Sequence, residues 1–132
     1  MRVLVADDDP VYRDMLKSLL EEWHFDVLFA ADGAEAWAIL QQPDAPELVI
    51  LDWKMPKMDG YEVCRLIREA RGADVPYVLL MTVQTKREDL LKILVAGVDD
   101  YLLKPFEPLD LKIRLRTAIR ILDLQKAVAA GV

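Results

Sequence analysis

Hydrophobic positions along this chain form five short apolar runs, which alternate with five longer segments that are apolar on one side only. Short runs of aliphatic residues are typical of strands buried in a parallel sheet, and one-sided segments are typical of helices packed on it. The runs predict strands near residues 2–6, 26–30, 48–51, 77–81 and 100–103. The other segments predict helices near residues 10–23, 33–41, 60–71, 86–96 and 108–126. Five strand–helix units predict one α/β domain with helices on both faces of a parallel sheet.

Capping residues mark the ends of the predicted helices. Asp9 can cap the first helix, with Pro10 at its first position, and Gly97 can end the fourth helix in the left-handed conformation. Capping-box spacing, an acceptor side chain followed three residues later by glutamate, occurs at Asp32, Asp59 and Thr85. The apolar stripe of the first helix is expected to comprise Val11, Met15, Leu19, Leu20 and Trp23.

Composition narrows the class of protein. The chain has 132 residues, 54% of them hydrophobic and 30% charged, with a net charge of −6. An acidic domain is a poor binder of nucleic acid, and no apolar run approaches the ~20 residues that span a bilayer. Met1 and Arg2 lead directly into a strand, not into a signal peptide. The single cysteine, Cys64, lies on the apolar stripe of the third helix and fits a reducing compartment, so we expect a core position and a cytoplasmic location.

Polar residues follow four of the five predicted strands, where each strand ends. These residues are Asp7, Asp8, Asp52, Thr82 and Lys104. The carboxyl ends of parallel strands meet at one edge of the sheet, where open α/β sheets bind ligands, so we expect these side chains to converge. Carboxylates, a hydroxyl and an ammonium together suit a divalent cation and a phosphoryl group.

Each acidic residue also has an ordinary structural interpretation. A lone aspartate such as Asp52 is about as often a turn or capping residue as a nucleophile that forms an acyl phosphate. Asp59 already caps the next helix, which favours the nucleophile. Asp7 and Asp8 would repel one another unless a cation such as Mg²⁺ lay beside them, although a solvated acidic turn is the commoner case for a bare pair.

The remaining candidates are weaker alone. Thr82 could be a β-favouring residue at a strand end, and an isolated lysine is ordinarily a surface residue. Pro105 holds Lys104 in an extended backbone at the sheet edge, which favours a site. Tyr101 fits either the core or a mobile surface ring, and both interpretations remain open.

Together the motifs resemble a response-regulator receiver domain of two-component signalling, of the chemotaxis-regulator type. They are V-L-V-A-D-D-D-P, L-D-W-K-M-P-K-M-D-G, L-M-T and D-Y-L-L-K-P-F, and the resemblance runs from Val3 to about Ile121. It implies a flavodoxin-like (βα)5 three-layer sandwich with a parallel five-stranded sheet of order 2-1-3-4-5. It also implies a receiver domain over residues 1–126, with 127–132 as a tail that starts a linker to an output domain or forms a free C-terminus.

The resemblance assigns roles at the acidic end of the site. Asp52 would accept a phosphoryl group from a histidine kinase or a phosphotransfer protein. Asp8 and Asp52 would bind Mg²⁺ directly, while Asp7 would act mostly through water. The main-chain carbonyl of Lys54 would complete the protein ligands.

The resemblance also implies how a signal would leave the site. Thr82 and Lys104 would contact the phosphoryl group, and the peptide bond before Pro105 would be cis. Movement of Thr82 coupled to Tyr101 would change the face formed by the fourth helix, the fifth strand and the fifth helix. Receivers usually carry a small residue after the threonine, whereas this chain has Val83, which bears on access to the acceptor.

Such a domain is a switch and not an enzyme, apart from promoting its own phosphorylation and dephosphorylation. Its expected partners are a histidine kinase or phosphotransfer protein, an output domain and a second copy of the chain, with no direct contact to nucleic acid or membrane. One alternative is a Mg²⁺-dependent phosphohydrolase with an aspartyl-phosphate intermediate, but such enzymes typically carry an aspartate where Lys54 stands. Another is a degenerate receiver that only binds partners, which the intact set of site residues disfavours.

Overall fold

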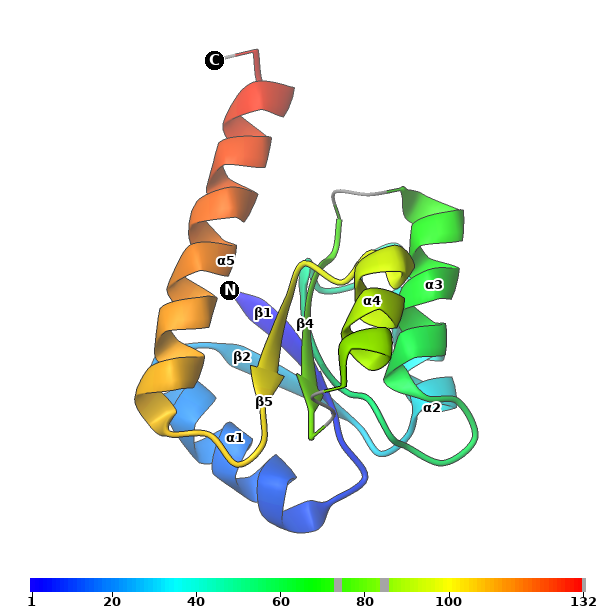
Figure 1. The fold of residues 1–132 in the computed structure, drawn as a ribbon. Helices are drawn as coiled ribbons and strands as arrows, with labels where there is room; N and C mark the ends of the chain where they lie inside the picture. The colour runs from blue at the N-terminus through cyan, green and yellow to red at the C-terminus, as the bar shows by residue number, and fades with distance from the viewer. Residues whose placement is uncertain (73–74, 84–85, 132) are drawn as a thin grey trace.

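Strands and helices alternate along the whole chain in the computed structural model, which describes residues 1–72, 75–83 and 86–131. The elements in order are β1 (Arg2–Ala6), α1 (Pro10–Glu22), β2 (Asp26–Ala30), α2 (Gly33–Leu40), β3 (Leu48–Asp52), α3 (Gly60–Arg71), β4 (Tyr77–Thr82), α4 (Arg87–Ala96), β5 (Asp100–Leu103) and α5 (Pro108–Ala129). The strands form one sheet of order β2-β1-β3-β4-β5, and every pairing is parallel. Helices α1 and α5 cover one face, and α2, α3 and α4 cover the other (Figure 1). The predicted three-layer sandwich and its strand order are confirmed.

The sheet separates two apolar cores because successive side chains of a strand point to opposite faces. Val3 and Val5 of β1 join the core beneath α1 and α5, whereas Leu4 and Ala6 join the core beneath α2, α3 and α4. Cys64 belongs to the second core and is fully buried, as predicted. Since both faces are covered, β1, β3 and β4 are almost continuously apolar, and their carboxyl ends form a rigid edge for the residues that follow.

Most helix ends follow the capping predictions. The side chains of Asp9, Asp32 and Asp59 accept hydrogen bonds from the first turns of α1, α2 and α3 at 2.8 to 2.9 Å. Gly97 ends α4 with φ of 87°, in the left-handed region that favours glycine. The start of α4 differs, because Lys86 occupies the N-cap position and the helix begins at Arg87. Thr85, the expected cap, lies outside the described residues.

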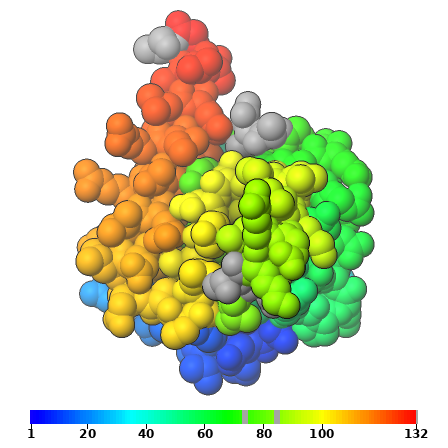
Figure 2. Space-filling model, in the orientation of Figure 1, coloured from blue at the N-terminus to red at the C-terminus, as the bar shows by residue number. Residues whose placement is uncertain are grey.

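Two predictions about the helices are wrong. Val11 is 74% exposed and does not belong to the buried stripe of α1, which is centred on Leu16 and Leu20. At about 100° per residue, Val11 lies about 140° around the helix from Leu16, so it faces away from the sheet. Helix α5 continues to Ala129, three residues beyond its predicted end at 126. Its last turns project from the body of the domain (Figures 1 and 2).

Within the described part of the chain, no helix has the length and apolar character needed to cross a membrane.

Candidate functional site

Three carboxylates meet at the carboxyl edge of the sheet. Asp7 and Asp8 follow β1, and Asp52 is the last residue of the neighbouring strand β3. Each offers an oxygen within 4.8 Å of the others. Asp7 is fully buried, Asp8 is exposed, and the Asp52 side chain is 13% exposed. The Asp7 carboxylate is held in place because its Oδ1 accepts a hydrogen bond from the Asp9 amide at 2.9 Å.

Lys104 brings a positive charge to this edge from the end of β5, the outermost strand of the sheet. It follows β5, and its Nζ lies 2.9 Å from Asp7 Oδ2 and 3.2 Å from Asp52 Oδ1. Only 9% of the lysine side chain is exposed. The Lys104 amide donates to the Thr82 carbonyl at 2.9 Å, which fixes the backbone beside the end of β4. The peptide bond between Lys104 and Pro105 is cis, as expected.

Burial and charge shape the ionisation of this cluster. Burial and the negative charge of Asp7 raise the pKa of Asp52, the Lys104 ammonium opposes both effects, and the net result is a pKa of about 6. Burial alone would lower the pKa of Lys104, but the hydrogen bond to Asp7 and the charge of Asp52 outweigh it, so this pKa is raised. The lysine therefore stays charged and neutralises part of a crowded acidic group.

A divalent cation suits the same cluster. Mg²⁺ prefers oxygen ligands and is commonly bound by one or two carboxylates together with water and phosphate oxygens. Asp7, Asp8 and Asp52 bring three carboxylates within ligand distance of one point, and Asp8 is open to solvent. A single lysine cannot balance three negative charges, so the residues present fit the ion that the sequence suggests.

The other candidate residues surround the acidic cluster. Thr82 ends β4 and is buried, with 2% exposure, next to β3 in the sheet. Lys54 lies in the loop after β3 and is exposed, with its ammonium 4.9 Å from the centre of the Trp53 ring. Val83 is 62% exposed directly after Thr82. Carboxylates, lysine and threonine thus end neighbouring strands at one edge, as the chain pattern predicts.

Residues of α1 and of the loop after β3 were missed by sequence reasoning. The Arg13 guanidinium donates to the Asp7 carbonyl at 3.1 Å, and the Tyr12 ring lies 3.9 Å from Lys104 Nζ. The Gly60 amide donates to the Trp53 carbonyl at 2.8 Å. A Cβ atom on Gly60 would lie 2.3 Å from the Asp52 carbonyl oxygen, so only glycine allows this approach. The sequence contains no local signal for the Tyr12 contact, because that contact depends on how α1 packs on the sheet.

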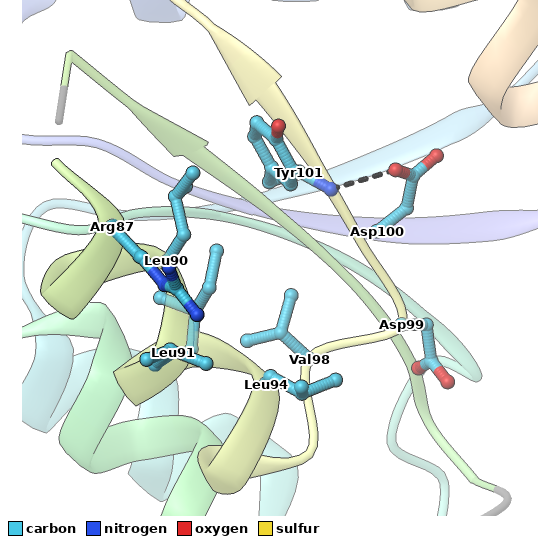
Figure 3. Close-up of a pocket in the computed structure, with 9 residues that line it drawn as sticks. Arg87, Leu90, Leu91, Leu94, Val98, Asp99, Asp100 and Tyr101 are labelled. Carbon is cyan, nitrogen blue, oxygen red and sulfur yellow. Dashed lines mark hydrogen bonds between the residues drawn. The ribbon is translucent and has the colours of Figure 1, made fainter. Parts of the chain in front are cut away.

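An apolar groove lies on the α4–β5 side of the molecule. It has a volume of about 390 Å³ and lies between the side chains of α4 and the start of β5 (Figure 3). Tyr101, half-buried, forms one wall beside Leu90, and Leu94 is 70% exposed at the other side. The sequence left open whether Tyr101 lies in the core or at the surface. In the structure the residue does both, because it packs partly against the core and partly lines the groove.

The fold and the acidic site are those of a receiver-type domain, and comparison with known proteins assigns the family. The profile of the response regulator receiver domain matches residues 3–116, so the chain belongs to that family. It is a receiver domain of the two-component response regulators, which are signalling proteins and not classical enzymes.

Individual relatives agree with this assignment. The chain is 40% identical to the DNA-binding dual master transcriptional regulator RpaA of Synechocystis over 92% of its own length and 50% of the relative. The structure matches the receiver domain of sensor histidine kinase PA1611 from Pseudomonas aeruginosa, which was solved with a magnesium ion coordinated in its active-site cleft. That match has a TM-score of 0.78 and 29% identity, over 89% of this chain and 96% of the other.

A third match is a longer protein. A probable two-component system response regulator/GGDEF domain protein aligns with a TM-score of 0.86 and 32% identity. The alignment covers 93% of this chain but 50% of that one. The chain likewise spans about half the length of curated relatives such as RpaA.

Proposed function

We propose that this domain is a phospho-acceptor switch in which Asp52 takes a phosphoryl group from a histidine kinase or a phosphotransfer protein. The observation that carries the proposal is the place of Lys104, whose ammonium lies between the carboxylates of Asp7 and Asp52. A cation already directed at Asp52 can follow the negative charge that a phosphoryl group would add there. Asp52 itself is partly exposed, so a donor can reach it.

The chemistry is the transfer of a phosphoryl group from a nitrogen or oxygen atom of the donor to an oxygen of the Asp52 carboxylate. An oxygen of the Asp52 carboxylate forms a bond to phosphorus while the bond from phosphorus to the donor breaks, and the donor leaves with the electron pair. The carboxylate charge of −1 becomes about −2 on the acyl phosphate. Lys104 and the Thr82 hydroxyl are the groups that would contact the added phosphoryl oxygens.

Mg²⁺ completes the proposed site. Asp8 and Asp52 would bind the ion directly, Asp7 would act mostly through water, and the Lys54 carbonyl would supply a main-chain oxygen. The bound ion would neutralise charge on the transferring phosphoryl group. Three carboxylates sum to −3, so one Mg²⁺ leaves −1, and Lys104 offsets the further charge added by phosphorylation.

The proposed output is the face formed by α4, β5 and α5, and Thr82 would act on it through Tyr101. Tyr101 lines the apolar groove beside α4 (Figure 3). Its carbonyl accepts a hydrogen bond from Arg114 of α5 at 2.9 Å. A change in the position of Tyr101, which lies on β5, would therefore alter its contacts with both α4 and α5. The face would contact an output domain, a partner protein or a second copy of the chain. The net charge of −6 disfavours direct binding of nucleic acid by this domain.

The division of the chain follows from the same proposal. Residues 1–126 would form the receiver domain, and 127–132 would begin the linker to an output domain or form a free end. The continuation of α5 to Ala129 supports a helical connection. The lengths of the curated relatives support an attached output domain.

Phosphorylation of intact protein tests the proposal. Acetyl phosphate with Mg²⁺ should add the mass of one phosphoryl group, and chelation of the metal or Asp52→Asn should abolish the gain. Asp59→Asn is the matched control, because it changes a neighbouring aspartate whose capping role asparagine can fill. A mass gain that persists in Asp52→Asn, or that does not depend on Mg²⁺, would contradict the assignment.

A further inference from the structure

Among the described residues, the Lys104 ammonium lies beside two carboxylates and one aromatic ring. The carboxylates are those of Asp7 and Asp52, at 2.9 and 3.2 Å. The ring is that of Tyr12, whose centre lies 3.9 Å from Nζ. An ammonium over the face of an aromatic ring is attracted by the negative charge of the π system. The ring therefore holds the lysine without competing for a proton and without adding another charge to the acidic cluster.

Tyr12 is itself held from two sides. It lies in the first turn of α1, which is capped by Asp9 just after the acidic residues of β1. Its ring packs against Phe106, with ring centres 6.0 Å apart and planes inclined at 43°. Phe106 stands two residues after Lys104, so one α1 side chain contacts both ends of the turn that carries the lysine. Both rings are half-buried, which limits their rotation.

We propose that Tyr12 is a positioning residue for the phosphorylation of Asp52: its ring fixes the Lys104 ammonium at the acceptor carboxylate. A lysine has a long, flexible side chain, so ordering its ammonium between two carboxylates loses rotamer entropy. The attraction between the ammonium and the ring, whose centre lies 3.9 Å from Nζ, offsets part of that loss. The inference rests on the proposed function, since it concerns the reaction at Asp52.

Substitutions of Tyr12 separate the ring from the hydroxyl. Tyr12→Leu removes the π face, and phosphorylation of Asp52 by acetyl phosphate at saturating Mg²⁺ should slow by about threefold to tenfold. Tyr12→Phe keeps the face and should restore a rate close to that of the original protein. Tyr12→Met, a flexible side chain without a π face, should behave like Tyr12→Leu and serves if that variant folds poorly.

A matched control lies on the same helix. Lys112 places its ammonium 5.6 Å from the centre of the Trp23 ring, at the other end of α1 and far from the site. Trp23→Leu therefore removes a comparable contact and a large side chain from α1 but leaves Lys104 untouched. Its phosphorylation rate per folded molecule should not change, even if its melting temperature falls.

A spectroscopic measurement reports the contact apart from activity. The ring should shift the methylene protons next to Lys104 Nζ upfield in NMR spectra of lysine-labelled protein, with the signal assigned by its loss in Lys104→Arg. The shift should persist in Tyr12→Phe and Trp23→Leu and vanish in Tyr12→Leu.

The possible outcomes distinguish the two proposals. An unshifted lysine signal in the original protein, a normal rate in Tyr12→Leu, or a Tyr12→Phe variant as slow as Tyr12→Leu would overturn the role of the ring. Failure of the original protein to become phosphorylated on Asp52 would instead overturn the proposed function, and the role of Tyr12 in the reaction with it, whatever the NMR shift.

Discussion

At the scale of single residues, the site combines burial with incomplete charge neutralisation. Asp7 is fully buried and the Asp52 side chain is only 13% exposed, yet one lysine contacts both carboxylates. Removing water from like charges is unfavourable, which is why the pKa of Asp52 is raised to about 6 by burial and by Asp7 despite the presence of Lys104. The unrelieved repulsion favours any ligand that brings positive charge to this edge.

Val83 is the residue whose effect on the proposed acyl phosphate can be tested most simply. An aspartyl phosphate is lost when water attacks the phosphorus in line with the departing carboxylate. The branched side chain follows Thr82 directly and is 62% exposed, so it can screen the phosphoryl group without supporting the core. Val83→Ala should shorten the lifetime of the phosphorylated protein, by roughly twofold to tenfold if the lost screening is worth about 0.5–1.4 kcal/mol.

The decay of phosphorylated protein after removal of the donor gives this lifetime, as the loss of the added mass with time. Val95→Ala is a suitable control, because Val95 is 81% exposed on α4, away from the acidic cluster. An unchanged or longer lifetime in Val83→Ala would exclude a screening role for Val83.

At the scale of elements, the loop from β3 to α3 is shaped by close backbone contacts. The Gly60 amide donates to the Trp53 carbonyl, and the Asp59 side chain caps α3, so the loop closes directly over the end of β3. Lys57 has φ of 69° and contacts Asp32 at 3.4 Å, which ties the loop to the start of α2. The loop that follows Asp52, the proposed acceptor, is thus tied to the starts of two helices.

Gly60→Ala should disturb this arrangement. The new Cβ would meet the Asp52 carbonyl oxygen and a methyl group of Leu80, so the loop must move away from β3. We expect a loss of about 1–3 kcal/mol in the free energy of unfolding, as for other overpacked sites, and weaker binding of Mg²⁺. Urea titration and a Mg²⁺ titration followed by Trp53 fluorescence would measure the two effects.

Gly72→Ala provides the comparison for Gly60. Gly72 caps the end of α3 with φ of 87°, and among the described residues other than its chain neighbours no atom lies within 4 Å of the point that an added Cβ would occupy. Only the strain of a backbone conformation that is essentially confined to glycine, with ψ of −166°, should therefore appear, about 1–3 kcal/mol. Binding of Mg²⁺ should not change in this variant. Equal loss of Mg²⁺ affinity in both variants would show that the loop contact at Gly60 is not specific to the site.

At the scale of the whole molecule, α5 has two apolar sides. Leu111, Leu115, Ala118 and Leu122 are buried against the sheet. Ile121, Leu124 and Val128 form a second, exposed stripe beside a groove of about 390 Å³. The C-terminal end of α5 projects from the body of the domain (Figure 2). The spacing of three and four residues in the exposed stripe is heptad-like, with branched residues flanking a leucine, which favours pairing of two parallel helices.

Self-association should therefore depend on the exposed stripe. Sedimentation should find mostly monomer in the unmodified protein and more dimer with Mg²⁺ and beryllofluoride, a phosphoryl mimic. Ile121→Glu combined with Leu124→Glu should abolish the shift, because charge would be buried between the helices. Asp123→Asn, on the polar side of the same turn, should leave the shift intact. A double variant that still dimerises would place the output surface elsewhere.

Sequence alone determined the order of elements, most helix caps and the residues gathered at the sheet edge. It could do so because a parallel sheet covered on both sides requires apolar strands, and polar residues that follow such strands share one edge. The strand order came from the family resemblance, since local pattern carries no information on which strands pair.

Only the tertiary structure decided which groups touch Lys104. The orientation of α1 directs Tyr12 and Arg13 toward the site while it turns Val11 to solvent, and the packing of that helix on the sheet sets this orientation. The structure likewise decided whether Ile121 and Leu124, on the second apolar side of α5, are covered: both are exposed, and Leu122 is the last buried residue of the helix. Periodicity identifies an apolar side, but the neighbouring elements determine whether that side is covered.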